Sequence, residues 1–190
     1  VLPFRPRVEK IVIKDAKLRT FITDEDHRDE MVAPVYDTTY EFVNKDKDTL
    51  VVIDDSIVRG TTLEKSILKM LDRLHPKKIV VVSSAPQIRF PDCYGIDMSR
   101  MGDFVAFRAM IELMKEQGKD HLLDEVYEQC LHAPQDEHPQ NYVKRLYEKF
   151  TDEQLSAKIS EIVRPADMRA EVQVVFQTAE NLHKAIPHHE

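Results

Sequence analysis

The sequence predicts an α/β protein built on a parallel sheet, and three observations carry this prediction. Two short apolar runs, Leu50–Ile53 and Ile79–Val82, are typical of strands that are buried on both faces of such a sheet. The segment between them, Thr61–Leu74, has its apolar residues at helical spacing. Strand, helix and strand in this order predict a right-handed βαβ unit.

The segment that precedes this unit carries weaker signals. Arg7–Ile13 alternates polar and apolar residues as a strand does, and Leu18–Ile22 is a second candidate strand. Residues 23–30 are mostly charged and suit a loop or the start of a helix. Residues 31–43 contain Pro34 among β-branched and aromatic residues, so the choice between an extended, irregular or helical segment stays open.

Helical periodicity dominates the rest of the chain. Four helices are predicted, at Phe104–Gln117 (with Gly118 as its C-cap), His121–Leu131, Tyr142–Phe150 and Asp152–Val163. Thr151 and Gln154 have the spacing of a capping box at the start of the last of these, and Arg164-Pro165 ends it. Val172–Phe176 is either a strand or the start of a helix that runs to Ile186.

A polar, proline-containing linker, Pro134–Pro139, marks the predicted internal boundary. It separates an α/β region at residues 1–133 from a mainly helical C-terminal appendage at residues 134–190. The amphipathic helices of Tyr142–Val163 suit packing on this domain or on another subunit, and the pattern does not decide between the two.

Composition excludes several classes of protein. The 190 residues include 27 Lys and Arg against 34 Asp and Glu, a net charge of −7, which argues against broad binding of nucleic acid or anionic membranes. No apolar run approaches the roughly 20 residues of a membrane span, and no signal-peptide pattern opens the chain. Cys93 and Cys130 form neither a disulfide framework nor a C-x-x-C pair, so we expect a cytoplasmic protein.

Two features suggest a piece of a larger protein. The 4 glycines are about 2% of the chain, where roughly 7% is usual, although phosphate-handling loops normally need several. The chain also begins at Val1 instead of Met.

The stretch from Asp54 to Thr62 carries the clearest chemistry. Two acids, Asp54 and Asp55, end a predicted parallel strand, at the sheet edge where α/β proteins bind ligands. Gly60 permits close approach of the backbone, and the helix that follows offers amide groups and a positive dipole end to a phosphate. The phosphate-binding candidates are Ser56, Ile57, Val58, Arg59, Gly60, Thr61 and Thr62. The carboxylates suit ribose hydroxyl groups or Mg²⁺, so a sugar phosphate would span the loop.

Each part of this stretch also has a simpler interpretation. Paired acids often form turns, and Thr before a helix is often only an N-cap. The sequence is neither the G-x-x-x-x-G-K-[ST] loop nor the G-x-G-x-x-G dinucleotide motif. The ordered combination of acids, glycine and hydroxyls favours the functional interpretation.

The run Val-Ile-Asp-Asp-Ser-Ile-Val-Arg-Gly-Thr-Thr resembles the phosphoribosyl pyrophosphate (PRPP) signature of type I phosphoribosyltransferases. In its full form it is similar to that of the amidophosphoribosyltransferases. Three flanking segments agree with that family: Arg19–Ile22, Ser84–Pro91 and Tyr94–Asp97. The resemblance is good from about Arg19 to Ile111.

The resemblance implies an enzyme that transfers glutamine-derived ammonia to PRPP. The products are 5-phosphoribosylamine and pyrophosphate, in the first step of purine synthesis. Asp54 and Asp55 would be the catalytic residues and would also hold Mg²⁺ with PRPP, while Ser56 to Thr62 would surround the 5′-phosphate. Residues near Ser84–Phe90 would line the far side of the ligand. The family relation also implies a homo-oligomer.

Three departures from the family pattern shape the expectation for this chain. The family's glutaminase domain, with its amino-terminal Cys nucleophile, would precede Val1 and is expected to be missing here. Between Ile22 and Asp54 the family carries a basic stretch, where this chain keeps Arg28 but then has Met31–Asp37. Two cysteines without C-x-x-C spacing argue against the iron–sulfur cluster that some members hold.

We therefore expect this chain to be the C-terminal part of an amidophosphoribosyltransferase, inactive by itself. Formation of phosphoribosylamine from PRPP and free ammonia by this chain would contradict that expectation. Two alternatives stay open: a non-catalytic module that senses PRPP or a nucleotide, and a structural relic whose loop binds no phosphate.

Overall fold

The computed structural model describes residues 7–8, 12–14, 36–38, 43–92, 98–134 and 140–186. The chain forms two compact units. Unit 1 comprises Val1–Leu50, Thr61–Ile79 and Pro165–Glu171, and unit 2 comprises Val51–Gly60, Val80–Arg164 and Val172–Glu190. Among the described residues, no helix combines the length and the apolar character that a membrane crossing requires.

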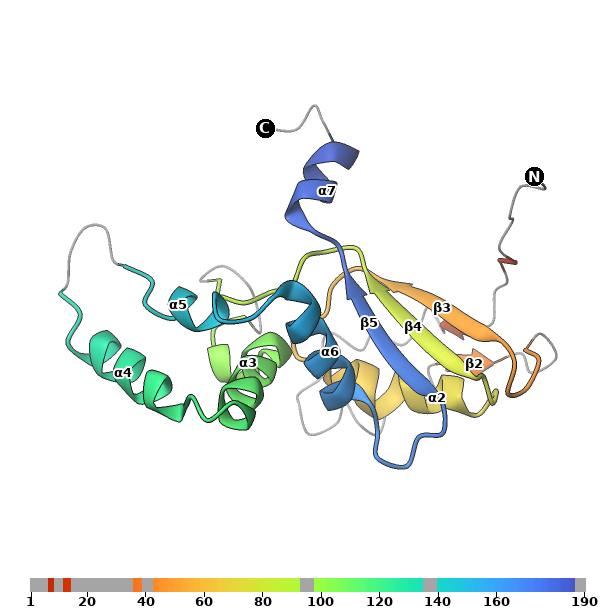
Figure 1. Cartoon of the computed structure of the whole chain (residues 1–190). Coiled ribbons are helices and arrows are strands. Elements are labelled where there is room, and N and C mark those ends of the chain that lie inside the picture. The colour runs from red at the N-terminus through yellow and green to blue at the C-terminus, as the bar shows by residue number, and fades with distance from the viewer. Residues whose placement is uncertain are drawn as a thin grey trace. The chain divides into compact units, whose positions relative to one another are not determined.

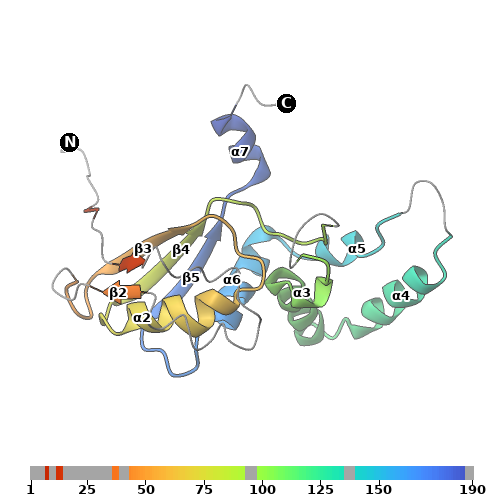
Figure 2. The same cartoon turned by 180° about the vertical axis from the view of Figure 1, so that it is seen from behind.

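The central element is a three-stranded parallel sheet. Its strands, in the order in which they pair, are β3 (Thr49–Asp54), β4 (Lys78–Ser83) and β5 (Glu171–Phe176). Figures 1 and 2 show the three strands side by side from opposite directions. The Lys77 amide donates to the Asp48 carbonyl at the start of the first pair, and the Ser84 amide donates to the Asp54 carbonyl at its end. The two strands start at the same edge of the sheet and end at the same edge, so they are parallel. The predicted parallel α/β architecture is confirmed.

The structure shows which conformation Val172–Phe176 adopts, a choice between strand and helix that periodicity leaves open. Glu171–Phe176 is a strand, and a separate short helix, α7 (Ala179–Ala185), follows it. Residues beyond 134 thus contribute to the sheet as well as supplying helices. The division between residues 1–133 and 134–190 stays a prediction, and residues 135–139 of the linker lie outside the described part.

The prediction that β3 is buried on both faces is wrong for the described structure. Leu50 is buried, but Val51 is 63% exposed and Ile53 is 80% exposed. Neighbouring β4 alternates in the same way, with Ile79 and Val81 fully buried and Val80 between them only partly buried. An apolar run shows that the side chains on both faces of a strand can be buried. It does not show whether another segment covers each face.

Unit 1 contains the helical run that follows the loop. The run begins at Thr61 and continues through a π-helical turn, η2 (Leu63–Ile67), into α2 (Leu68–Asp72). The Leu68 amide donates to the Leu63 carbonyl, five residues back, which defines the π turn. The predicted helix is confirmed, although apolar spacing does not reveal the π turn.

Two short strands also belong to unit 1. β1 (Val12–Lys14) pairs antiparallel with β2 (Tyr36–Thr38). β1 overlaps the end of the strand predicted at Arg7–Ile13, and β2 shows that part of residues 31–43 is extended. The second candidate strand, Leu18–Ile22, lies outside the described residues.

Unit 2 holds the remaining helical elements. They are the 3₁₀ turn η3 (Met101–Asp103) and the helices α3 (Val105–Glu116), α4 (Asp120–Leu131), α5 (Lys144–Tyr147) and α6 (Asp152–Val163), together with α7. α3 packs against α6. Gly118 follows α3 with a φ of +63°, as a C-terminal glycine does.

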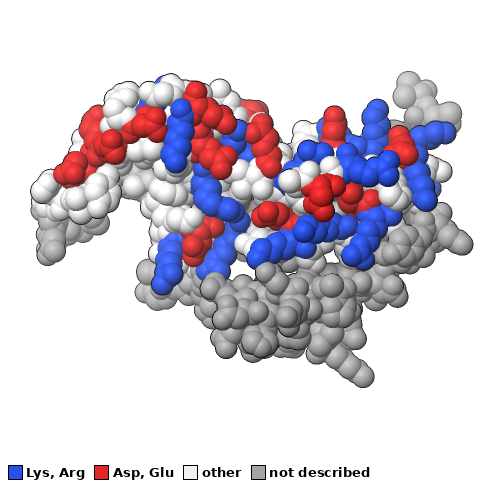
Figure 3. Space-filling model, turned by 90° about the horizontal axis from the view of Figure 1, so that it is seen from below, with Lys and Arg blue, Asp and Glu red and all other residues white. Residues whose placement is uncertain are grey.

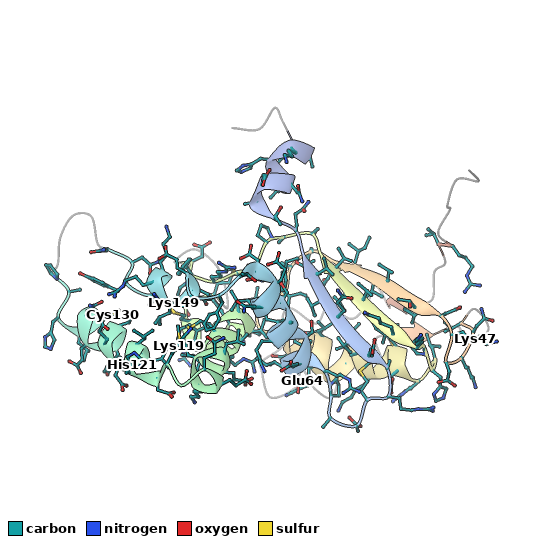
Figure 4. The ribbon with its side chains drawn as sticks, viewed as in Figure 1. Lys47, Glu64, Lys119, His121, Cys130 and Lys149 are labelled. Atoms are coloured by element: carbon teal, nitrogen blue, oxygen red, sulfur yellow. The ribbon has the colours of Figure 1, made fainter. Side chains whose placement is uncertain are left out.

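The core of unit 2 shows where the C-terminal helices pack. Its buried cluster consists of Met110, Met114, Val126, Leu146, Tyr147, Phe150 and Leu155. These residues come from α3, α4 and the segment 146–155, so the predicted helices of Tyr142–Val163 pack on this unit. Lys119, between α3 and α4, places its ammonium 5.6 Å from the centre of the Phe150 ring (Figure 4).

The surface of α4 accounts for part of the acidic surplus. The helix carries Asp120, Asp124, Glu125 and Glu128 and contains neither Lys nor Arg. Figure 3 shows acidic side chains gathered at this end of unit 2. An anionic partner would therefore be repelled from this surface.

The capping box predicted at α6 is present. The Gln154 amide donates to Thr151 Oγ1 (3.2 Å), and the Thr151 amide donates to Gln154 Oε1 (2.9 Å). We expect Thr151→Ala to lower the free energy of unfolding by about 1 kcal/mol, because the Gln154 amide loses its side-chain partner. Urea denaturation measures this difference. Thr151→Ser keeps the hydroxyl and serves as the control, and an alanine variant as stable as the wild type would contradict the role of the cap.

Candidate phosphate-binding site

The loop of interest begins where β3 ends. Asp54 is the last residue of the strand, and Asp55 to Gly60 continue from it within unit 2. Thr61 and Thr62 begin the helical run that belongs to unit 1. Asp55 and both threonines are exposed, whereas Ile57 is only 4% exposed. Polar groups of the loop thus face solvent while one apolar side chain anchors it.

The two acids are held by short local hydrogen bonds. Asp54 Oδ1 accepts from the Asp55 amide at 3.0 Å, and Asp55 Oδ1 accepts from the Ser56 amide at 2.8 Å. Each bond engages one of the two oxygens of its carboxylate. This is the turn-forming role of such residues, and it also fixes where both carboxylates lie.

Burial raises the pKa of the Asp54 carboxyl above its usual value, and the neighbouring Asp55 carboxyl adds to the increase. An ionised Asp54 is therefore under strain from desolvation and from like charge. A cation or a hydroxyl donor placed beside the pair would relieve that strain. The arrangement favours a ligand that brings positive charge or hydrogen-bond donors to the carboxyl end of β3.

The acids fit the way in which Mg²⁺ is held together with a phosphorylated ligand. Mg²⁺ is commonly bound by one or two carboxylates, with phosphate oxygens and water completing its octahedral shell. Within the described ranges, no group of three or more metal-binding side chains comes together. Asp54 and Asp55 are carboxylates of the kind that holds Mg²⁺ together with ligand oxygens and water.

Four hydrogen bonds tie the carbonyl groups of the loop to the body of unit 2. Ser84 donates from its amide to the Asp54 carbonyl (2.9 Å) and from Oγ to the Asp55 carbonyl (3.0 Å). Two more groups come from α3: the Val105 amide donates to the Val58 carbonyl (2.9 Å), and Arg108 Nη2 donates to the Arg59 carbonyl (2.7 Å). The shape of the loop is therefore set by segments that follow it in the sequence.

Gly60 occupies a position that only glycine suits. Its φ is +74°, in the left-handed region, and a Cβ added there would lie 2.8 Å from Val163 Cγ1 and 3.5 Å from Val105 Cγ2. The loop thus lies directly against α3 and α6. The sequence predicts that this glycine lets the backbone approach a phosphate, which stays a prediction, and the structure shows in addition that it packs on Val163 and Val105.

The Arg59 guanidinium forms an ion pair with an acidic side chain of η3. The sequence predicts that its charge contributes to phosphate binding, but its Nη2 lies 3.3 Å from Asp103 Oδ2. Asp103 ends η3 and belongs to no recognisable motif, as is also true of Arg108. No sequence signal identifies these two residues, because their link to the loop depends on tertiary packing.

Thr62 is not used as a helix cap. Thr62, at the start of η2, has helical dihedral angles, and its side chain makes no capping hydrogen bond. The simple interpretation of this residue as an N-cap is therefore not supported. Its side chain is exposed.

The residues that follow β4 contact two different parts of unit 2, the candidate loop and α6. Ser84 joins the loop, whereas Gln87 and Arg89 turn toward α6, where Gln87 Nε2 donates to Ser156 Oγ (2.8 Å) and Arg89 pairs with Asp152. Those residues line a separate cavity of about 510 Å³. Arg19–Ile22 and Tyr94–Asp97 lie outside the described residues.

Cysteine chemistry does not contribute to this loop in the described structure. Cys130 lies exposed on α4 (Figure 4), on a different element from the loop. Cys93 lies outside the described residues.

Comparison with known proteins points to one family. Amidophosphoribosyltransferases of Pasteurella multocida and Escherichia coli are 43% and 41% identical over 96 residues, which is 50% of this chain and 19% of theirs. The enzyme of Pyrococcus horikoshii is 40% identical over 74 residues, 38% of this chain and 16% of its own length. The chain thus matches less than a fifth of the length of each of these relatives, and no family model matches it. The resemblance indicated by the loop is confirmed: about half of the chain is similar in sequence to amidophosphoribosyltransferases.

Proposed function

We propose that the loop from Asp54 to Thr62 binds the ribose 5-phosphate portion of PRPP, and that the whole protein transfers ammonia to this ligand. The observation that carries the proposal is the position of the motif. Two carboxylates lie at the carboxyl end of β3, and a glycine held against two helices leads into a helix start with exposed hydroxyls. Relatives named amidophosphoribosyltransferase support the choice of ligand.

The two ends of the loop would perform different tasks. At one end, Thr61, Thr62 and the backbone amides would donate hydrogen bonds to the 5′-phosphate, helped by the positive end of the helix dipole. At the other end, Asp54 and Asp55 would accept hydrogen bonds from the ribose hydroxyls. Binding at both ends would fix the sugar so that its C1 atom faces the incoming nitrogen.

The proposed reaction replaces one bond at C1 by another. The lone pair of ammonia forms the C1–N bond, the C1–O bond to pyrophosphate breaks with its electron pair, and the nitrogen loses one proton. Positive charge develops on the ribose ring as the leaving group departs. The carboxylates of Asp54 and Asp55 would stabilise that charge electrostatically.

Mg²⁺, bound together with the pyrophosphate group of the ligand, would offset the negative charge of the leaving group. Asp54 and Asp55 are the residues that we propose to hold it, since carboxylate oxygens are its preferred protein ligands. We also propose a glutaminase domain as the source of ammonia, assembly as a homo-oligomer and a cytoplasmic location, from the resemblance stated above.

One observation favours a second function. The stretch that is basic in the family is replaced here by Met31–Asp37, which removes cations suited to pyrophosphate. A module that senses PRPP or a nucleotide would keep the loop for the 5′-phosphate without needing those cations. Such a module would bind AMP or ribose 5-phosphate at least as tightly as PRPP.

Isothermal titration with PRPP, ribose 5-phosphate and AMP, each with and without Mg²⁺, separates these functions. We expect PRPP to bind most tightly, and only with Mg²⁺ present. Thr62→Val, which removes one hydroxyl without changing shape, should weaken binding about tenfold, since a hydrogen bond to a charged group is lost. Thr49→Val, at the other end of β3, is the matched control. Failure of all three ligands to bind the folded protein would contradict both functions.

A further inference from the structure

Asp103 and Arg108 approach the candidate loop although neither belongs to its motif. Arg108 Nη2 lies 2.7 Å from the Arg59 carbonyl oxygen, and Asp103 Oδ2 lies 3.3 Å from Arg59 Nη2. Both residues come from the η3–α3 segment. Arg59 is therefore held at its backbone and at its side chain by the same short stretch of chain.

The residues beneath this contact are buried. Phe104, which lies between η3 and α3, is fully buried, and Val105 is 1% exposed. α3 in turn packs along α6, and Val163 of α6 closes on Gly60. The segment that contacts the loop is therefore itself held in the packed core of unit 2.

These contacts also decide the direction of two peptide groups. In a planar trans peptide, the carbonyl of one residue and the N–H of the next point to opposite sides. Since the carbonyls of Val58 and Arg59 face α3, the N–H groups of Arg59 and Gly60 face the side away from α3. That is the side on which amide donors could meet a phosphate.

We propose that Asp103 and Arg108 are positioning residues that set the amide orientation of the phosphate loop, and that Arg59 acts as their anchor instead of as a phosphate ligand. This inference rests on the proposed function for its ligand, but its structural part stands on the contacts alone. Arg108 holds the Arg59 carbonyl, and Asp103 holds the Arg59 guanidinium against η3.

Removing the charge of Asp103 tests the proposal, because the two interpretations of this residue predict opposite changes in ligand affinity. If Asp103 were only a nearby charge, Asp103→Asn would remove a repulsion and tighten the binding of an anion. It would also release the Arg59 guanidinium toward the phosphate. If Asp103 positions the loop, the same substitution weakens binding. We expect three- to tenfold weaker binding of ribose 5-phosphate by Asp103→Asn.

Three further variants test whether the effect belongs to the ion pair between Asp103 and Arg59. Asp124→Asn removes the same charge from exposed α4 and should leave binding unchanged. Asp103→Glu keeps the carboxylate and should restore at least half of the lost affinity. Because Asp103 acts through Arg59, Asp103→Asn should have no further effect in a chain that already carries Arg59→Met.

Titration calorimetry of these variants is combined with hydrogen exchange of the amides of residues 57–62. We expect faster exchange in this segment for Asp103→Asn and an unchanged melting temperature, since a partly exposed ion pair adds little to global stability. Equal or tighter binding by Asp103→Asn, or additivity with Arg59→Met, would overturn the proposal. If the wild type binds no ligand, the proposed function fails, and the positioning role is then tested by hydrogen exchange alone. Unchanged amide exchange of residues 57–62 in Asp103→Asn would overturn the positioning role. Faster exchange in this variant would support it.

Discussion

Asp54→Asn is expected to abolish Mg²⁺-dependent binding of PRPP while raising the melting temperature of the protein at pH 7. Asp54 is partly buried beside a second carboxyl, and this raises its pKa. Its ionised form therefore disfavours the folded state. Asparagine keeps the shape but carries no charge, so the strain is removed together with the proposed metal ligand. Loss of a direct ligand should reduce affinity by about a hundredfold or more.

The stability gain should depend on pH in a defined direction. A carboxyl whose pKa is raised by folding binds its proton more tightly in the folded state than in the unfolded state. Its favourable contribution is complete below the unfolded pKa and is lost as the pH rises through the folded pKa. The difference in melting temperature between Asp54→Asn and the wild type should therefore be largest at pH 7 and decrease toward pH 4.

Calorimetric melting between pH 4 and pH 8 measures this difference. Asp124→Asn on α4 is the control for removing one negative charge from an acidic protein. If Asp54→Asn melted at the same temperature as the wild type at pH 7, or below it, burial of the charge would not be a source of strain. PRPP binding by the asparagine variant with wild-type affinity would remove Asp54 from the site.

Gly60→Ala is expected to destabilise the protein far more than Gly118→Ala. Both glycines have positive φ, +74° and +63°, so an alanine at either position costs about 1 kcal/mol in backbone strain. At Gly118 no atom lies within 4 Å of the added Cβ, whereas at Gly60 it would meet Val163 Cγ1 at 2.8 Å. Overpacking of this kind adds about 1–3 kcal/mol.

Urea denaturation of the two alanine variants separates strain from steric conflict. The double variant Gly60→Ala with Val163→Ala should be less unstable than the sum of its single changes, because the second change makes room for the first. Gly60→Ala should also lose binding of ribose 5-phosphate, since the loop must move to accommodate the methyl group. Equal destabilisation at Gly60 and Gly118 would show that the loop does not lie against α6.

Periodicity predicts several of the regular elements of this fold. The apolar runs at Leu50–Ile53 and Ile79–Val82, and the spaced apolar residues of α3 and α6, each depend on residues close in sequence. Local patterns of this kind report directly on local structure. The capping box at Thr151 was predictable for the same reason, since its partner is three residues away.

Features that depend on distant residues were not predictable. Nothing near Val51 or Ile53 indicates that one face of β3 stays exposed, because coverage is decided by other segments. The π turn at Leu63–Ile67 leaves the apolar spacing of a helix almost unchanged. Asp103 is far from Arg59 in sequence, so their ion pair follows no period.

The same distinction between features set by nearby residues and features set by distant residues applies to the candidate site. The order of acids, glycine and threonines identified the loop, and the resemblance to amidophosphoribosyltransferases supplied a ligand. The ion pair of Arg59 with Asp103 could not be predicted, because no local pattern links the two residues. The contacts of Asp103 and Arg108 with Arg59 depend on the packing of η3 and α3 against the loop.

The most direct test of the central claim is a two-dimensional amide NMR titration of the protein with ribose 5-phosphate. Amides that donate to a phosphate shift strongly when the ligand binds, so the spectrum identifies the residues involved. We predict that the largest shifts fall on Ser56 to Thr62, with Gly60, Thr61 and Thr62 foremost. Shifts confined to the cavity beside Gln87 and Ser156, or a spectrum that does not change, would contradict the claim that this loop binds phosphate.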